Sequence, residues 1–237
     1  MNPTIARITT RGLLGRRRIW LLVPLPLILV GLALLGRAFG ATPEEWGEPV
    51  IVGLGFAAVL PVIALIVGTG VVGSEIDDGT ITHILAKPLP RSEILFTKLA
   101  VAVGVTAAFA GVPLFVAGVI ANSLSLAFAL VVGSVVGSLA YSALFVMVSV
   151  LTRRPVLLGL VYVVLWEGLL GNILSGTQKL SIQQYVLSIV DWLAPTDILH
   201  GKVSVPVSFV MAGVFTVAAS AYAVQRLRTF SVAGETG

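Results

Sequence analysis

Glu167 is an acidic residue inside an apolar run, residues 156–174, of this 237-residue chain. It lies about eleven residues from the start of that run, which places it near the middle of a bilayer if the run is a helix. An ionisable group at that depth is costly and indicates a role toward a substrate cation or a proton. The alternative is a protonated carboxyl group that is hydrogen-bonded to a neighbouring backbone or to Tyr162. The sequence leaves both interpretations open.

The residue patterns of common enzyme classes are absent. The chain contains no G-x-x-x-x-G-K-[ST] phosphate-binding loop, no H-E-x-x-H and no G-x-S-x-G. His83 and His200 stand alone in polar segments, which favours solvated or docking roles over metal binding, and there is no cysteine. We therefore expect no catalytic residue, no metal site and no bound cofactor. A membrane-embedded enzyme with a catalytic Glu167 is an alternative, but no partner nucleophile or metal set supports it.

Charged and polar side chains are concentrated in the segment 74–98, SEIDDGTITHILAKPLPRSEILFTK. Apolar runs at 50–72 and 99–121 flank it, and each has the roughly 20 residues that a membrane-spanning helix needs. The segment must then lie in water on one side of the membrane. Ser74 followed by Asp77 resembles a capping box, so the pattern predicts that a short helix begins there.

This predicted short helix has one apolar face and a defined end. Pro88 and Pro90 stop it, because proline lacks a donor and restricts the residue before it. Ser92 can then cap a second helix that continues into the membrane. The apolar residues that recur at helical spacing are Ile81, Ile84 and Leu85.

The same segment resembles the signature E-x-E-x-G-T…L-x-x-P-x-x-R-x-E-I-x-x-x-K of permease subunits of ABC transporters with the type V exporter fold. His83 and Lys87 depart from it, since the family usually has apolar residues there. The resemblance in sequence covers about 25 residues, and beyond them it rests on hydropathy and topology. The matching anchors are Glu75, Asp77, Gly79, Thr80, Leu85, Pro88, Arg91, Glu93, Ile94 and Lys98.

The resemblance implies that this segment is a cytoplasmic coupling helix with its flank, which docks on an ATPase subunit. It also implies an assembly of two ATPase copies with a second permease copy, as a homodimer, in which ATP and Mg²⁺ bind the ATPase partner. The residues expected at the contact are Glu75, Asp78, Gly79, Thr80, Ile81, His83, Ile84, Leu85, Pro88 and Arg91.

Composition and hydropathy predict one all-α membrane domain over residues 1–237. The chain is 57% hydrophobic and 11% charged, with a mean hydropathy of +1.04, which is too apolar for a soluble domain. Six transmembrane helices are expected at about 19–36, 50–72, 99–121, 124–151, 156–174 and 207–224.

Three further elements are predicted around these spans. The basic residues 2–18 suit an N-terminal interfacial helix. An amphipathic helix near 182–193 would be a re-entrant or interfacial helix on the outer side, between spans five and six. Trp46 is expected at the membrane interface in an outer loop. In the fourth span Gly133-x-x-x-Gly137 offers a ridge for close helix packing, more often inside one subunit than between two.

The distribution of basic residues predicts the orientation. With both termini in the cytoplasm, about twelve of the 15 Lys and Arg residues lie inside and only Arg37, Lys179 and Lys202 lie outside. This places the chain in the cell membrane as a multi-pass protein with lipids as partners. The net charge of +4 is therefore a matter of topology, and no nucleic-acid partner is expected.

The resemblance favours an ATP-driven exporter that moves a hydrophobic or amphipathic substrate such as a drug, antibiotic, peptide or lipid. The alternative is an ABC permease for cofactor export or metalloenzyme maturation, of the haem-export or copper-site-assembly type. Large side chains within spans are candidates for the substrate pathway, although lipid contact or packing explains most such residues. The pathway candidates are Phe56, Leu60, Trp166 and Glu167.

Overall fold

The computed structural model describes residues 3–13, 15, 20–77, 90–170 and 177–229. Within these residues the regular elements are helices, and the only β pairing is an isolated bridge between Thr196 and Leu199. The expected all-α class is therefore confirmed for the part of the chain that the structure covers.

Five helices in the described residues are long and apolar enough to cross a membrane. They are Trp20–Ala38, Pro43–Val72, Ser92–Ile120, Leu124–Leu151 and Val205–Leu227. Each overlaps one of the predicted spans. The predicted span 156–174 corresponds to a shorter apolar helix, Pro155–Leu169, and residues 171–174 lie outside the described residues. The exact six-span arrangement is therefore not confirmed, although five of the six predicted spans have the required length.

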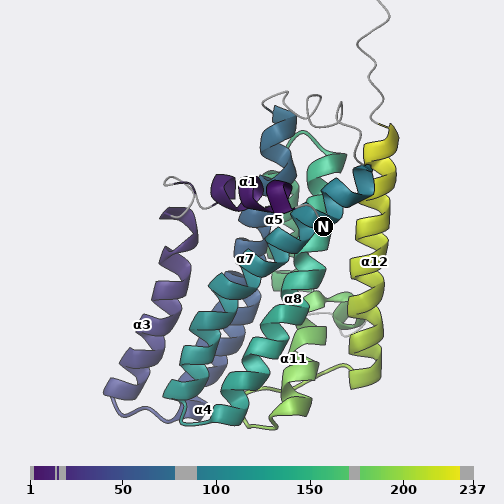
Figure 1. Cartoon of the computed structure of the whole chain (residues 1–237). Coiled ribbons are helices and arrows are strands. Elements are labelled where there is room, and N and C mark those ends of the chain that lie inside the picture. The colour runs from purple at the N-terminus through teal and green to yellow at the C-terminus, as the bar shows by residue number, and fades with distance from the viewer. Residues whose placement is uncertain (1–2, 14, 16–19, 78–89, 171–176, 230–237) are drawn as a thin grey trace, which may run out of the picture.

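The helices run mainly along one direction, side by side (Figure 1). The first two spans are built from α3 (Pro24–Ala38), α4 (Pro43–Gly47), η1 (Glu48–Val59) and α5 (Leu60–Asp77). The remaining long helices are α7 (Arg91–Ile120), α8 (Leu124–Leu151) and α12 (Val205–Thr229). Shorter elements are α1 (Pro3–Leu13), α9 (Pro155–Val161), η2 (Tyr162–Leu170), η3 (Thr177–Leu180) and α11 (Ile182–Leu193).

Proline positions explain several helix starts and irregularities. Pro24 is the first residue of α3, and the preceding helical turn is interrupted at Val23, as proline at this position requires. The 12-residue π-helical stretch η1 follows directly on α4 and continues into α5. The second span is consequently one long helix whose first half, Glu48–Val59, is π-helical.

The polar segment differs from its prediction at both described edges. Helix α5 runs through Ser74 and ends at Asp77, so Ser74 does not begin a new helix. Helix α7 begins at Arg91 with Pro90 as its N-cap, so Ser92 is an internal residue of the first turn rather than a cap. At Ser74 the helix of the preceding span continues without a break, and at the other edge the first turn of α7 already includes Ser92.

Trp46 is not an exposed interfacial residue. It lies in α4, where a capping box joins Thr42 and Glu45, and its side chain is 6% exposed. A side chain added at Gly36 would meet the Trp46 ring at 2.8 Å, so α3 and α4 pack in close contact there. The expected loop thus contains a short helix whose tryptophan fills space inside the subunit.

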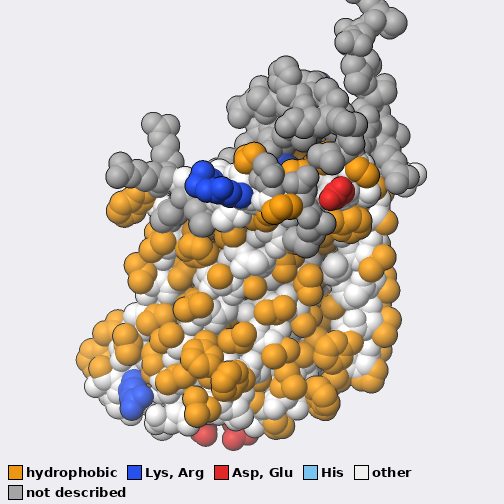
Figure 2. All heavy atoms as spheres, viewed as in Figure 1, with side chains coloured by type: hydrophobic (Ala, Val, Ile, Leu, Met, Phe, Trp, Pro, Cys, Tyr) orange, Lys and Arg blue, Asp and Glu red, His pale blue; other side chains and the backbone are white. Residues whose placement is uncertain are grey.

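Helix α8 is the centre of the bundle. It packs against α5, α7, α11 and α12, and more than half of its residues are buried. The outside of the molecule is mostly hydrophobic along its middle, with charged side chains near the two ends of the bundle (Figure 2). This distribution suits helices whose outer faces contact lipid.

Helix α1 lies across the ends of α5 and α7 and packs against both (Figure 1). Leu13 is buried against the bundle, whereas Arg7 and Arg11 are exposed. Ile8 is 66% exposed and faces away from the protein. The predicted N-terminal helix is present, and its crosswise position is the one that an interfacial helix adopts.

Candidate functional site

The carboxylate of Glu167 is the centre of a buried polar cluster. Its side chain is only 1% exposed. Oε1 accepts hydrogen bonds from the Tyr162 hydroxyl at 2.8 Å and from the backbone N–H of Ile182 at 3.0 Å. Oε2 accepts from the Ser181 hydroxyl and from the backbone N–H of Gln183 at 3.4 Å. Both carboxylate oxygens therefore have protein donors.

Three of these four donors belong to the start of α11, and Tyr162 is the first residue of η2. Ile182 and Gln183 are its first two residues, whose N–H groups have no partner inside the helix. Ser181 is the N-cap and accepts from the backbone N–H of Gln184 at 3.3 Å. A carboxylate is also favoured at a helix N-terminus by the helix dipole. Glu167 therefore joins η2, which is part of the shorter apolar helix Pro155–Leu169, to the N-terminus of α11.

Two further tyrosines lie near this carboxylate. The buried hydroxyl of Tyr141, on α8, interacts with Glu167 electrostatically but makes no hydrogen bond of good geometry. The Tyr185 hydroxyl donates to the backbone oxygen of Lys179. Burial, with a smaller contribution from the charge of Glu167, raises the pKa of Tyr185 to about 12. Tyr185 thus stays protonated and keeps its donor role at physiological pH.

Glycines on α8 allow α11 to approach closely. A side chain at Gly133 would meet Val190 at 2.3 Å, and one at Gly137 would meet Val186 at 3.1 Å. Gly137 also faces Leu60 of α5 at 2.5 Å. The Gly133-x-x-x-Gly137 ridge therefore packs helices inside one subunit, as the sequence favoured.

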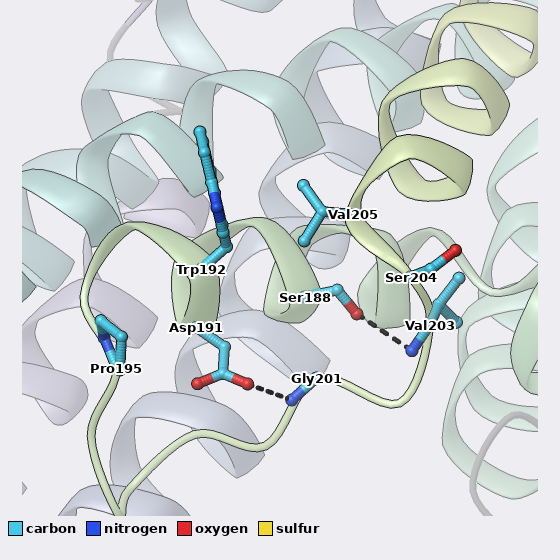
Figure 3. Close-up of a pocket in the computed structure, with 8 residues that line it drawn as sticks. All are labelled: Ser188, Asp191, Trp192, Pro195, Gly201, Val203, Ser204 and Val205. Carbon is cyan, nitrogen blue, oxygen red and sulfur yellow. Dashed lines mark hydrogen bonds between the residues drawn. The ribbon is translucent and has the colours of Figure 1, made fainter.

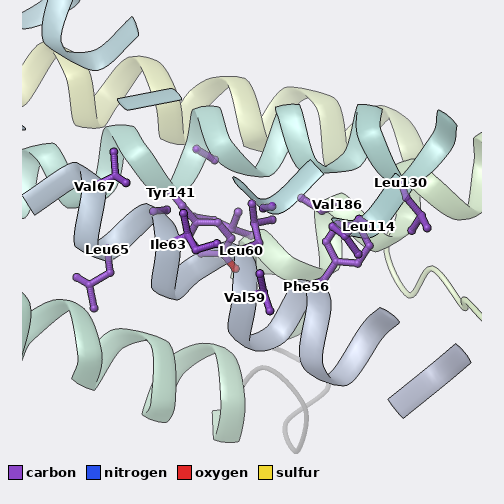
Figure 4. Close-up of a cluster of buried hydrophobic side chains, with 14 of the residues drawn as sticks. Phe56, Val59, Leu60, Ile63, Leu65, Val67, Leu114, Leu130, Tyr141 and Val186 are labelled. Atoms are coloured by element: carbon purple, nitrogen blue, oxygen red, sulfur yellow. The ribbon is translucent and has the colours of Figure 1, made fainter. Parts of the chain in front are cut away.

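Three of the four pathway candidates, Phe56, Leu60 and Glu167, are buried, and Trp166 is half-buried. Phe56 and Leu60 are fully buried in the cluster that also contains Val186 of α11 (Figure 4). Trp166 is half-buried, and its indole N–H donates to the backbone oxygen of Leu180 at 3.3 Å. Phe56, Leu60 and Glu167 thus surround α11, while Trp166 bonds to the residue that ends η3.

The described edges of the polar segment are joined by a buried lysine. The Lys98 side chain is 3% exposed, and its Nζ donates to the backbone oxygen of Val71 at 2.7 Å. Lys98 lies in α7 and Val71 in α5, so this bond ties together the two helices that hold the segment 78–89.

Most of the predicted ATPase-contact residues lie outside the described residues. Two of them are described: Glu75 is in the last turn of α5 and Arg91 is the first residue of α7. These positions place both at the bases of the segment. The contact residues that fall outside are Asp78, Gly79, Thr80, Ile81, His83, Ile84, Leu85 and Pro88.

Sequence reasoning missed Ser181 and the helix end to which Glu167 binds. The signal was present, because Ser181 followed by Gln184 has the capping-box spacing just before an amphipathic run.

Among the described residues, no group of three or more His, Cys, Asp or Glu side chains could hold a metal ion.

Comparison with known proteins gives one match. A protein-family model described as an ABC-2 family transporter protein matches residues 4–221, nearly the whole chain. No curated protein matches the chain significantly.

Proposed function

The chain belongs to the ABC-2 family of transporter proteins, and we propose that it is the membrane subunit of an ATP-driven exporter for a hydrophobic or amphipathic substrate. The family assigns the general role: a multi-pass permease without ATPase activity that binds no cofactor, with ATP hydrolysed by a partner subunit. The match over residues 4–221 carries this conclusion, since it includes all five long apolar helices apart from the end of the last one.

The proposed complex contains two copies of this chain and two ATPase subunits. ATP and Mg²⁺ would bind the ATPase subunits, because this chain has no phosphate-binding loop. The positive-inside distribution of Lys and Arg supports an orientation with both termini in the cytoplasm. In that orientation α1, the end of α5 and the start of α7 face the ATPase.

The proposed ATPase contact is the segment between α5 and α7, with Ile81, Ile84 and Leu85 as its apolar face. Burial of each such side chain at an interface contributes on the order of 1.5–3 kcal/mol. The bond between Lys98 and the Val71 carbonyl supports a mechanical role for this region. A movement of the segment would be transmitted to α5 and α7 together, because this bond holds their ends to each other.

The Glu167 cluster supports a cargo that is not recognised as an anion. Short helices inside transporters often direct their N-terminal N–H groups at anionic substrate groups. Helix α11 has 12 residues, or about 18 Å, and so is shorter than the roughly 30 Å bilayer core. The first N–H groups of α11 are already bonded to the carboxylate of Glu167. A neutral or cationic amphipathic substrate is the chemistry consistent with that arrangement.

The proposed pathway side of the subunit contains Phe56, Leu60, Trp166 and Glu167. Phe56 and Leu60 are covered by α8 and α11 in this conformation. A substrate would reach them only when α11 moves relative to α8. Alternating access in this subunit would therefore involve a displacement of α11 together with the helix Pro155–Leu169, because Glu167 of that helix is hydrogen-bonded to the start of α11.

Co-expression with a candidate ATPase subunit, followed by reconstitution in liposomes, tests the proposed function. We expect the two proteins to purify together and ATP hydrolysis to rise with hydrophobic or amphipathic compounds. A matched complex with an inactive ATPase controls for background hydrolysis. Stimulation by haem or copper complexes alone would support the maturation alternative, and failure of the two proteins to associate would contradict both.

A further inference from the structure

A pocket of about 380 Å³ lies between the end of α11, the start of α12 and the loop that joins them. Its volume is within the range of small-molecule sites. The loop is held against the rest of the subunit, since a side chain at Gly47 of α4 would meet Ile198 at 2.8 Å. The pocket is lined by Ser188, Asp191, Trp192, Pro195, Gly201, Val203, Ser204 and Val205 (Figure 3).

One side of the pocket carries a carboxylate with an available oxygen. Oδ2 of Asp191 accepts from the backbone N–H of Gly201 at 2.8 Å, and this bond fixes the carboxylate at the pocket wall. Within the described residues, Oδ1 receives no hydrogen bond and forms no ion pair. Ser188 accepts from the backbone N–H of Val203 at 3.2 Å and closes the loop beside it. The polar side of the pocket therefore presents a negative charge on a fixed backbone.

The other side of the pocket is apolar. Trp192 is 60% exposed, and Figure 3 shows it with Val205 on the side of α11 away from Asp191. Its ring contacts that of Phe209 edge to face, with 6.5 Å between centroids. An exposed aromatic side chain held in this way offers a surface for an alkyl chain or for the methyl groups of a quaternary ammonium.

The geometry points to a binding site for an amphipathic organic cation, with its charged group at Asp191 and its apolar chain against Trp192 and Val205. The inference goes beyond the transport role and needs neither the ATPase nor transport. Lys202 is exposed in the same loop, and among the described residues no ion pair joins it to Asp191. The carboxylate is therefore open to a ligand cation.

Binding of hexyltrimethylammonium to the purified full chain in a neutral maltoside detergent tests this site by calorimetry. We expect saturable binding of one cation per chain and no such binding of hexanesulfonate, which has the same alkyl chain and the opposite charge. Asp191→Asn keeps an oxygen that can accept from Gly201 and removes the charge, so affinity should fall by about ten-fold. Equal binding of the two probes, or unchanged affinity in Asp191→Asn, would overturn the proposal.

Asp197→Asn is the matched control, because Asp197 is exposed in the same loop but does not line the pocket. Its affinity for the cation should equal that of the unmodified chain. An equal loss in both variants would show general attraction of cations to a negative loop, and the site would be rejected.

A photoreactive hexyltrimethylammonium with a diazirine in its chain tests the site in the unmodified protein. Mass spectrometry should find the adducts on residues 188–205, and excess hexyltrimethylammonium should suppress them. Adducts that gather elsewhere, or that competition does not reduce, would contradict the assignment even if Asp191→Asn fails to fold.

Discussion

The buried carboxylate of Glu167 accepts hydrogen bonds from two hydroxyl groups and two backbone N–H groups. Hydrogen bonds to a charged group typically contribute about 1.5–3 kcal/mol each, and leaving a buried donor unsatisfied has a similar cost. The geometry therefore favours a positioning role for this carboxylate: it fixes where α11 begins relative to η2.

Glu167→Gln should lower the thermal unfolding temperature of the purified chain. The amide keeps one acceptor oxygen, but its NH₂ group would face two donors, from Ser181 and Gln183. We therefore expect the free energy of unfolding to fall by about 2–4 kcal/mol. Tyr162→Phe removes a single hydrogen bond to this carboxylate and should lower the free energy of unfolding by about 1.5–3 kcal/mol. Thermal unfolding followed by circular dichroism in detergent measures both.

The transport readout separates positioning from direct participation. If Glu167→Gln is as stable as the unmodified chain and changes only the pH dependence of transport, the carboxylate acts on a proton or a substrate cation. A stability loss together with an unchanged pH profile supports the positioning role.

The sequence predicted part of this cluster and missed the rest. The depth of Glu167 and its bond to Tyr162 follow from spacing along one helix. The bonds to Ser181 and α11 require a turn of the chain between η2 and η3, and hydropathy carries no information about that turn. The interfacial position predicted for Trp46 was wrong for a related reason. Its burial depends on Gly36, ten residues earlier, which leaves room for the ring.

Helix α11 is held by Glu167 at its start and by the glycine ridge of α8 along its length. Gly133→Ala should destabilise the chain by about 1–3 kcal/mol, because the added methyl group would lie 2.3 Å from Val190. Gly104→Ala is the control, since nothing lies within 4 Å of the added atom. Thermal unfolding compares the two, and equal stabilities would contradict the close packing of α8 and α11.

A disulfide between α8 and α11 tests whether α11 moves during transport. The chain has no cysteine, so Gly133→Cys with Val190→Cys introduces a single pair, at positions where a Cβ at residue 133 would lie 2.3 Å from a Val190 methyl group. Oxidation should abolish transport in liposomes, and a reductant should restore it. The single-cysteine variants control for the oxidant, and transport by the fully oxidised pair would show that α11 remains fixed to α8.

Helix ends were the least predictable elements. Ser74 and Ser92 are good caps in isolation, but α5 runs to Asp77 and α7 begins at Arg91, so both serines lie inside helices. Helix α11 was predicted with correct bounds because its apolar residues recur at helical spacing. Its burial was not predictable, since nine of its residues are covered by other helices of the bundle.

For the molecule as a whole, the orientation in the membrane is a separate prediction. Cysteines at Glu44 and Arg153 lie on exposed residues at opposite ends of the bundle, and neither position replaces the capping Glu45. A membrane-impermeant maleimide should label Glu44→Cys from outside intact cells and Arg153→Cys only after lysis. Labelling of both from the same side would contradict the positive-inside orientation.

At this scale composition and hydropathy predicted the class of the molecule well, because five long apolar helices dominate it. The packing order of these helices was not predictable, since it depends on small residues such as Gly133 and Gly159 that admit particular neighbours. The family was indicated by the segment 74–98, whereas its match extends over residues 4–221.

We propose that this permease is coupled to an ATPase through the segment between α5 and α7. Ile84→Asp places a charge on the proposed apolar face, and Ala86→Asp places the same charge about half a turn away on the opposite face. Each variant is co-expressed with the ATPase, and the ATPase that purifies with the membrane complex is quantified. We predict that Ile84→Asp releases the ATPase and Ala86→Asp retains it. Retention of a fully cargo-stimulated ATPase by Ile84→Asp would contradict the account.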